Sequence, residues 1–221
     1  MGVLESIVMF FQTGGIFMYP ILIVFAIGTA ISAERYVKLN MVKMQNRRVW
    51  GDIHPILEQG HFEKARGVLK EDGSAIGGLL NMGLARQGSV RRRDDIEIAM
   101  EESMMEIIPQ LEKRTPYVAL LSNIATLLGL LGTIMGLIEA FTAVANADPA
   151  EKADLLSASI SVAMNTTAFG LMVAIPLLIV HATLTSKTSE IVDSLEMASV
   201  KTLNLISDFA KRQTELASKN G

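Results

Sequence analysis

Hydroxyl and glycine residues recur along one side of two long apolar stretches of the chain, residues 118–144 and 157–184. In the first stretch, steps of four and three residues place the small and polar side chains on one face of an α-helix. They are Ser122, Thr126, Gly129, Thr133, Gly136 and Ala140. The corresponding face of the second stretch carries Ser159, Ala163, Thr166, Gly170 and Ala174. Two such faces predict a polar pathway embedded in the membrane.

The candidate pathway residues are Thr133 in the first stretch and Asn165, Thr166 and Thr167 in the second. We expect Thr133 and Thr167 to lie at similar depth, near the middle of the membrane. A single Ser or Thr in such a helix more often bonds to the carbonyl one turn earlier and serves as a packing contact. A cluster of Asn165, Thr166 and Thr167 facing Thr133 is harder to explain in that way, because an amide needs partners where water is absent.

Glycines and a proline in the same stretches have a structural interpretation. Gly132 and Gly136 form a small-xxx-small motif, which lets two helix backbones approach closely in lipid. Gly129 and Gly170 lie on the small faces and suit the same close packing. Pro176 removes a backbone donor and is expected to kink the helix that contains it.

Length and hydrophobicity place the chain among polytopic membrane proteins. Half of its 221 residues are hydrophobic, and its charges crowd outside the apolar stretches. At about 1.5 Å per residue, both long stretches can cross a hydrocarbon core of roughly 30 Å, and residues 15–33 are just long enough to do so. Because no strand pattern is present, we expect an all-α membrane protein with three transmembrane helices.

The positions of Lys and Arg predict the orientation of these helices. Residues 1–14 hold no basic residue, whereas several follow the first span. They are Arg35, Lys38, Lys43, Arg47 and Arg48. Further lysines and an arginine follow the third span, and residues 146–156 are short and mostly acidic. The positive-inside rule therefore places the N-terminus outside and the C-terminus in the cytoplasm.

The domain organisation follows from the three spans and their orientation. In chain order we expect an outer N-terminal segment with the first transmembrane helix at 1–39, a cytoplasmic helical domain at 40–115, the second transmembrane helix at 116–145, an outer loop at 146–156, the third transmembrane helix at 157–184 and a cytoplasmic C-terminal helix at 185–221. Apolar residues at helical steps predict that the second and third spans have long cytoplasmic extensions.

Several function classes have no support in the sequence. The chain has no cysteine, and therefore no disulfide framework, thiolate metal site or thiol nucleophile. It shows no phosphate-binding loop, no hydrolase motif, no metal-ligand helix and no nucleic-acid motif. We expect neither an enzyme nor a cofactor-binding protein, so any work must be driven by an ion gradient.

At this level of detail the chain resembles the MotA/TolQ/ExbB proton-channel family, the membrane subunits of ion-driven motors. The resemblance rests on the run LLGLLGTIMG at 127–136 and the run TAFGLMVAIP at 167–176. Glu34 and Arg35 after the first span and the turn at 60–65 are weaker matches. The order and number of spans are similar to those of the three-span ExbB and TolQ branch rather than the four-span MotA branch.

The resemblance implies a homopentamer in the bacterial inner membrane, with a periplasmic N-terminus and outer loop. It also implies that the pentamer surrounds two copies of a single-span partner of the ExbD, TolR or MotB type, whose membrane aspartate takes up and releases the ion. Ion flow would drive mechanical work, for example to energise outer-membrane transport. A TonB-like protein is a further candidate partner. Thr133 and Thr167 match the pore threonines of the family, and Thr166 is their neighbour.

The nature of the ion stays open in the sequence. This chain places no unambiguous ionisable residue at mid-membrane, so the group that changes charge must come from a partner. The glutamate that the ExbB branch carries about five positions before the matched threonine falls on Val162. The frequency of proton-driven members favours a proton, whereas oxygens of Asn165, Thr166 and Thr167 fit a partly dehydrated sodium ion. A non-conducting scaffold that holds partner proteins is the alternative function.

Overall fold

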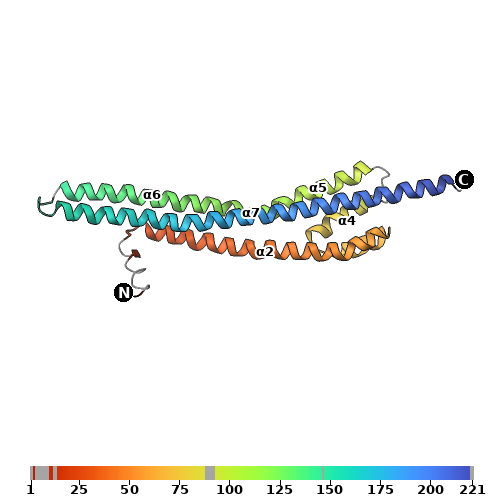
Figure 1. Ribbon diagram of the computed structural model, residues 1–221, viewed down its shortest axis with the longest axis horizontal. Helices are drawn as coiled ribbons and strands as arrows, with labels where there is room; N and C mark the ends of the chain where they lie inside the picture. Colours follow the sequence, from red (N-terminus) through yellow and green to blue (C-terminus); the bar gives the residue numbers. More distant parts are fainter. Residues whose placement is uncertain (1, 3–9, 12–13, 88–92, 146, 220–221) are drawn as a thin grey trace. The chain divides into compact units, whose positions relative to one another are not determined.

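The computed structural model describes residues 2, 10–11, 14–87, 93–145 and 147–219. Over these residues every regular element is a helix, which confirms the expected all-α class (Figure 1). The helices are α2 (Met18–Glu58), α3 (Phe62–Lys70), α4 (Ala75–Gln87), α5 (Arg93–Glu112), α6 (Thr115–Ala145) and α7 (Lys152–Lys219). Most of the N-terminal segment before residue 14, residue 146 of the expected outer loop and residues 220–221 lie outside the described part.

Three helical stretches are long and apolar enough to cross a membrane. They are Met18–Glu58, Arg93–Ala145 and Lys152–Leu216. Each contains one of the apolar segments expected from the sequence, so the prediction of three membrane-crossing helices is confirmed.

The chain forms two compact units. Unit 1 consists of Met1–Arg35 and Arg114–Leu184, and unit 2 consists of Tyr36–Lys113 and Thr185–Gly221. Both α2 and α7 continue from one unit into the other, so α2 runs without a break across the expected boundary at residue 39. The assignment of segments to the two sides of the membrane stays a prediction.

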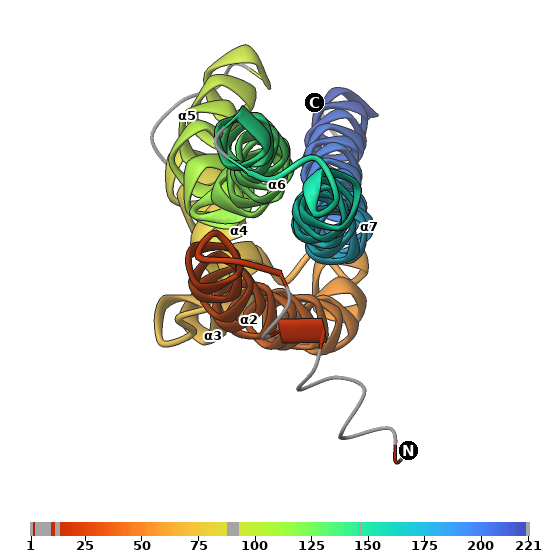
Figure 2. The same ribbon diagram turned by 90° about the vertical axis from the view of Figure 1, so that its left-hand side faces the viewer.

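In unit 1, α6 and the first part of α7 lie side by side, with the first turns of α2 next to both (Figure 2). The two ends of this three-helix packing are marked by specific contacts. At one end, a Cβ added to Gly15 would lie 3.2 Å from Val162 Cγ1. At the other end, Arg114 Nη1 lies 2.6 Å from Glu34 Oε2.

A turn separates α5 from α6. The sequence predicted a long cytoplasmic extension of the second span, but Arg114, between α5 and α6, has a φ of 68°, in the left-handed region. A left-handed residue interrupts an α-helix, because the helical hydrogen-bond path cannot continue through it. A new helix, α6, therefore begins at Thr115, in the second segment of unit 1.

In unit 2, hydrogen-bonded caps define the ends of the short helices. Gly60 has a φ of 77°, its N–H donates to Leu57 O and the next N–H, that of His61, donates to Ile56 O. This pair of bonds is the Schellman motif, which ends α2. At the start of α4, the Ser74 hydroxyl oxygen accepts the N–H of Gly77 at 3.0 Å. A serine at this N-cap position satisfies one of the unpaired donors of the first turn.

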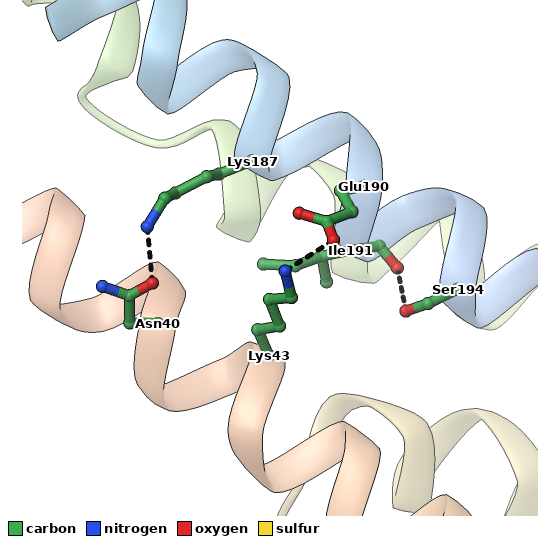
Figure 3. A network of polar contacts seen from close by, with 6 residues as sticks. All are labelled: Asn40, Lys43, Lys187, Glu190, Ile191 and Ser194. Carbon is green, nitrogen blue, oxygen red and sulfur yellow. Dashed lines mark hydrogen bonds and ion pairs between the residues drawn. The ribbon is translucent and has the colours of Figure 1, made fainter.

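Polar side chains also connect α2 and α7 within unit 2 (Figure 3). Lys187 Nζ donates to Asn40 Oδ1 at 2.6 Å and lies 3.8 Å from the centre of the Tyr36 ring. One helical turn further along both helices, Lys43 Nζ lies 2.5 Å from Glu190 Oε1. These contacts fix which residues of the two helices lie opposite one another.

Candidate ion pathway

The backbones of α6 and α7 touch where the two glycines of their small faces meet. A Cβ added to Gly129 would lie 3.2 Å from Gly170 Cα, and one added to Gly170 would lie 2.7 Å from Ala125 O. About two turns further toward the end of α6, a Cβ added to Gly136 would lie 2.9 Å from Ala163 Cβ. Such close approach is possible only with small residues, and it brings the side chains beside the glycines into contact across the helices.

Thr133 and Thr167 are brought together by this packing. Their hydroxyl groups form a short hydrogen bond across the helix interface. Thr167 Oγ1 also lies 2.8 Å from Gly129 O, and Thr133 Oγ1 lies 3.3 Å from Ala163 O and 3.4 Å from Gly129 O. The sequence expectation that these two hydroxyls lie at similar depth is therefore met by direct contact.

The hydroxyl pair keeps oxygen lone pairs that its own bonds do not use. A hydroxyl group has one hydrogen and two lone pairs. The shortest contact to a carbonyl is that of Thr167 Oγ1 with Gly129 O, and either hydroxyl can donate the hydrogen that joins Thr133 to Thr167. In either arrangement lone pairs remain for another group, and both threonines are only half-buried. The pair can accept a hydrogen bond from a protonated carboxyl group or contribute an oxygen ligand to a cation.

Thr166 faces a different neighbour. Its side chain is 2% exposed, and its hydroxyl donates to Gly14 O at 2.5 Å, just before the start of α2. Its methyl group lies against Gly132 of α6, where an added Cβ would collide with it. Thr166 thus connects α6, α7 and the segment that precedes α2.

Asn165 is half-buried and lies on another side of α7. At roughly 100° per residue, its side chain leaves the helix about 160° away from that of Thr167. Consecutive residues of a helix do not share a face. The expected cluster of three residues facing Thr133 is therefore reduced to the pair of Thr133 and Thr167.

Two further features belong to this region. Ser122 is fully buried and donates to Ala174 O of α7 at 2.7 Å, a contact that the helical spacing of the small face could have suggested. Pro176 lies inside α7, which continues on both sides of it. In the described part of the chain, no group of three or more acidic or histidine side chains is placed to hold a metal ion.

Hydroxyl side chains are thus paired across two long apolar helices, and from Thr115 to Ile138 and from Leu155 to Ser186 the sequence has no Asp, Glu, Lys or Arg. Residues 73–197, more than half of the chain, match the family model described as the MotA/TolQ/ExbB proton channel family. The chain belongs to this family. It is accordingly an integral membrane protein of a channel family whose members are not enzymes.

Three relatives have names from the ExbB and TolQ branch. A biopolymer transport protein ExbB homolog of Methanothermobacter thermautotrophicus is 25% identical over 85% of this chain and 66% of its own length. The Tol-Pal system protein TolQ of Haemophilus influenzae is 32% identical over 42% of this chain and 40% of its own. The biopolymer transport protein exbB1 of Vibrio cholerae is 47% identical over 26% and 25%, respectively. The chain thus covers just under two thirds of the first relative and less of the others.

Proposed function

We propose that this protein is the ion-channel subunit of an inner-membrane motor that couples proton or sodium flow to mechanical work. The observation that carries the proposal is the contact between the Thr133 and Thr167 hydroxyls at a junction of two membrane-crossing helices. The pair keeps oxygen lone pairs that its own hydrogen bonds do not use, and a passing cation or a protonated acid can bind to them.

The group that changes its charge must come from a partner. From Thr115 to Ile138 in α6, and from Leu155 to Ser186 in α7, the sequence contains no Asp, Glu, Lys or Arg. The hydroxyl groups of Thr133 and Thr167, which are hydrogen-bonded to each other and to the carbonyl of Gly129, cannot by themselves take up and release a proton. We therefore assign the carboxyl group to a single-span partner of the ExbD, TolR or MotB type, with a membrane aspartate beside Thr133.

The assembly follows the branch to which the relatives belong. Two partner helices inside a homopentamer, in a bacterial inner membrane, would bring the threonine pairs of successive subunits past each aspartate in turn. The N-terminus is assigned to the periplasm and the C-terminus to the cytoplasm by the positive-inside rule. Energising outer-membrane transport, with a TonB-like protein as a further partner, is one example of the work that such a motor would perform.

The four candidate residues have different roles in this proposal. Thr133 and Thr167 line the ion pathway. Thr166, with its hydroxyl on Gly14 O, positions α7 against the start of α2. Asn165, on another side of α7, suits a contact with a neighbouring subunit of the oligomer.

Replacement of each threonine by valine, which has nearly the same shape, tests the proposal. In cells or proteoliposomes that contain the partner, Thr133→Val and Thr167→Val should each abolish gradient-driven activity while the oligomer still assembles. Thr29→Val and Thr183→Val are matched controls, because these exposed hydroxyls bond to the carbonyl one turn earlier in their own helices. Both controls should retain activity.

Full activity of both pathway variants would contradict the channel function and favour the non-conducting scaffold.

The identity of the transported ion is tested by measuring activity with sodium withheld at a fixed proton gradient. Continued activity identifies the proton, and loss of activity identifies sodium. Val162 stands at the position of the glutamate found in the ExbB branch and packs beside Gly15. The pathway of this chain therefore has to function without a carboxylate there.

A further inference from the structure

One exposed face of α5 in unit 2 combines acidic and apolar side chains. The steps of four, three and one residue along α5 place four exposed residues on one side of the helix. They are Ile98, Glu102, Met105 and Glu106, which we call the acidic stripe. Met105 is 72% exposed and Ile98 is 53% exposed, so the apolar part of this stripe is not covered within the subunit.

An exposed face of α2, also in unit 2, carries the opposite charge. Met41, Met44, Arg47 and Arg48 are all exposed and follow one another at helical steps. We call these four residues the basic stripe. Met44 is 70% exposed and Met41 is 52% exposed, so this stripe too has an uncovered apolar part.

The charges of the two stripes are not used within the subunit. In the part of the chain that the structure describes, neither the two glutamates nor the two arginines of the stripes form an ion pair. Lys43 of α2, by contrast, is paired with Glu190. Exposed apolar side chains beside polar groups indicate a surface that contacts another protein.

The two stripes of one subunit lie on opposite sides of unit 2. Helix α4 packs against α5 where Gly83 meets Met100, and against α2 where Asn46 accepts the N–H of Ile76. In both views α5 and α2 lie on either side of α4 (Figures 1 and 2). The stripes of one subunit therefore cannot meet each other, and each has to be covered by another molecule.

Contacts with α7 show that the two stripes lie at the same level along the helices. Lys43 of α2 pairs with Glu190, so the arginines of the basic stripe lie level with residues 194–195 of α7. Met100 of α5 meets Ser199, and α5 runs in the opposite direction, so the glutamates of the acidic stripe lie level with residues 193–197. At roughly 1.5 Å per residue, the two sets of charges differ in level by less than about 5 Å.

We infer that the acidic stripe of one subunit docks on the basic stripe of the next subunit. This inference rests on the homo-oligomer of the proposed function. Each subunit offers one stripe of each kind on opposite sides, so the contact is head-to-tail. Because the stripes lie at the same level, copies related by rotation alone can close into a ring. The charges then select the partner surface and its level, and the apolar side chains of both stripes are covered.

Reversal of one stripe at a time tests this contact. Glu102→Lys with Glu106→Lys makes both stripes basic, and Arg47→Glu with Arg48→Glu makes both acidic. Because like charges that face each other oppose association, each double variant should raise the apparent dissociation constant of the oligomer by about tenfold or more. The variant with all four substitutions should restore the wild-type value. Light scattering of the purified complex with its partner, over a dilution series in detergent, measures the oligomer mass.

A matched control changes the net charge elsewhere in unit 2. Glu63→Lys with Glu71→Lys, at exposed positions of α3 and its C-cap, should leave the oligomer unchanged. Dissociation of this control would show that net charge alone acts, and it would overturn the inference. The inference is also overturned if both stripe variants keep the wild-type mass, or if the combined variant does not recover it.

Introduced cysteines test the same contact without a charge change. The chain has no cysteine, so a chain with Met44→Cys and Met105→Cys should form a ladder of covalent multimers on oxidation. Either substitution alone should give no linked dimer, because a head-to-tail contact does not bring Met44 to the Met44 of another copy. Linked dimers from a single variant, or no ladder from the pair, would contradict the inference. Activity retained by Thr133→Val would remove the proposed ion pathway and leave the crosslinking result intact.

Discussion

The Thr166 hydroxyl donates a hydrogen bond to the Gly14 carbonyl oxygen, with 2.5 Å between the two oxygens. This bond joins α7 to the residues that lead into α2, at the level of the Thr133 and Thr167 pair. Two adjacent threonines thus have separate tasks. Thr167 faces α6 and the proposed ion pathway, and Thr166 holds the residues just before the first membrane-crossing helix in place.

Removal of the Thr166 hydroxyl should therefore weaken the fold more than the pathway. In Thr166→Val the Gly14 carbonyl loses its donor, and we expect a loss of about 1–2 kcal/mol in the free energy of unfolding. Thr166→Ser keeps the donor and should retain most of this stability. Thermal unfolding of the purified oligomer in detergent compares the two. Equal melting temperatures of wild-type and Thr166→Val would show that the bond contributes nothing.

A methyl group at Gly170 should separate α6 from α7. The added Cβ would lie 2.7 Å from Ala125 O, and a backbone atom cannot move aside as a flexible side chain can. We expect Gly170→Ala to destabilise the protein by about 1–3 kcal/mol and to reduce gradient-driven activity, because the Thr133 and Thr167 contact depends on this approach. Circular dichroism on heating and the transport assay measure the two effects.

Gly78→Ala is the matched control for this variant. A Cβ at Gly78 in α4 meets no atom within 4 Å, so alanine should stabilise α4 by up to about 1 kcal/mol through its higher helix propensity. If Gly170→Ala behaved like Gly78→Ala, the backbones of α6 and α7 would have to be further apart than the Gly129 and Gly170 contact implies.

Asn46 should be important for the stability of unit 2. Its side chain is 3% exposed, and its Oδ1 accepts the N–H of Ile76 at 3.2 Å, in the first turn of α4. Asn46→Ala leaves that donor buried without its partner, which should reduce the free energy of unfolding by about 1–3 kcal/mol. Glu190→Gln, which removes the exposed ion pair with Lys43 in Figure 3, should change it by less than about 1 kcal/mol. Chemical unfolding of both variants tests this order, and the reverse order would refute it.

Arg114 should tolerate glycine better than alanine. Its φ of 68° is strained for any residue with a Cβ, and glycine relieves this strain. Both substitutions remove the contact with Glu34, so their difference reports the backbone alone. We expect Arg114→Gly to be more stable than Arg114→Ala by about 1 kcal/mol. At Glu101, an exposed position within α5, alanine should instead be the more stable by about 1 kcal/mol. The same preference for alanine at both positions would argue against the left-handed turn.

Local pattern alone was enough to predict the class of the protein and its small helix faces. The spacing of Ser122, Gly129 and Thr133 follows from the helical repeat, which needs no knowledge of neighbouring helices. The uncharged length of each span is likewise a property of the sequence. Family membership also follows from the sequence, through the match over residues 73–197.

Only the tertiary structure decided which of Asn165, Thr166 and Thr167 meets Thr133. Successive residues differ by about 100° around the helix, so the answer depends on how α7 is rotated about its axis, and the Gly129 and Gly170 contact sets that rotation. The level of α2 was undetermined for a related reason. An apolar helix can slide along its neighbours without any change in its own pattern, and only particular contacts, such as that of Thr166 with Gly14, fix its position.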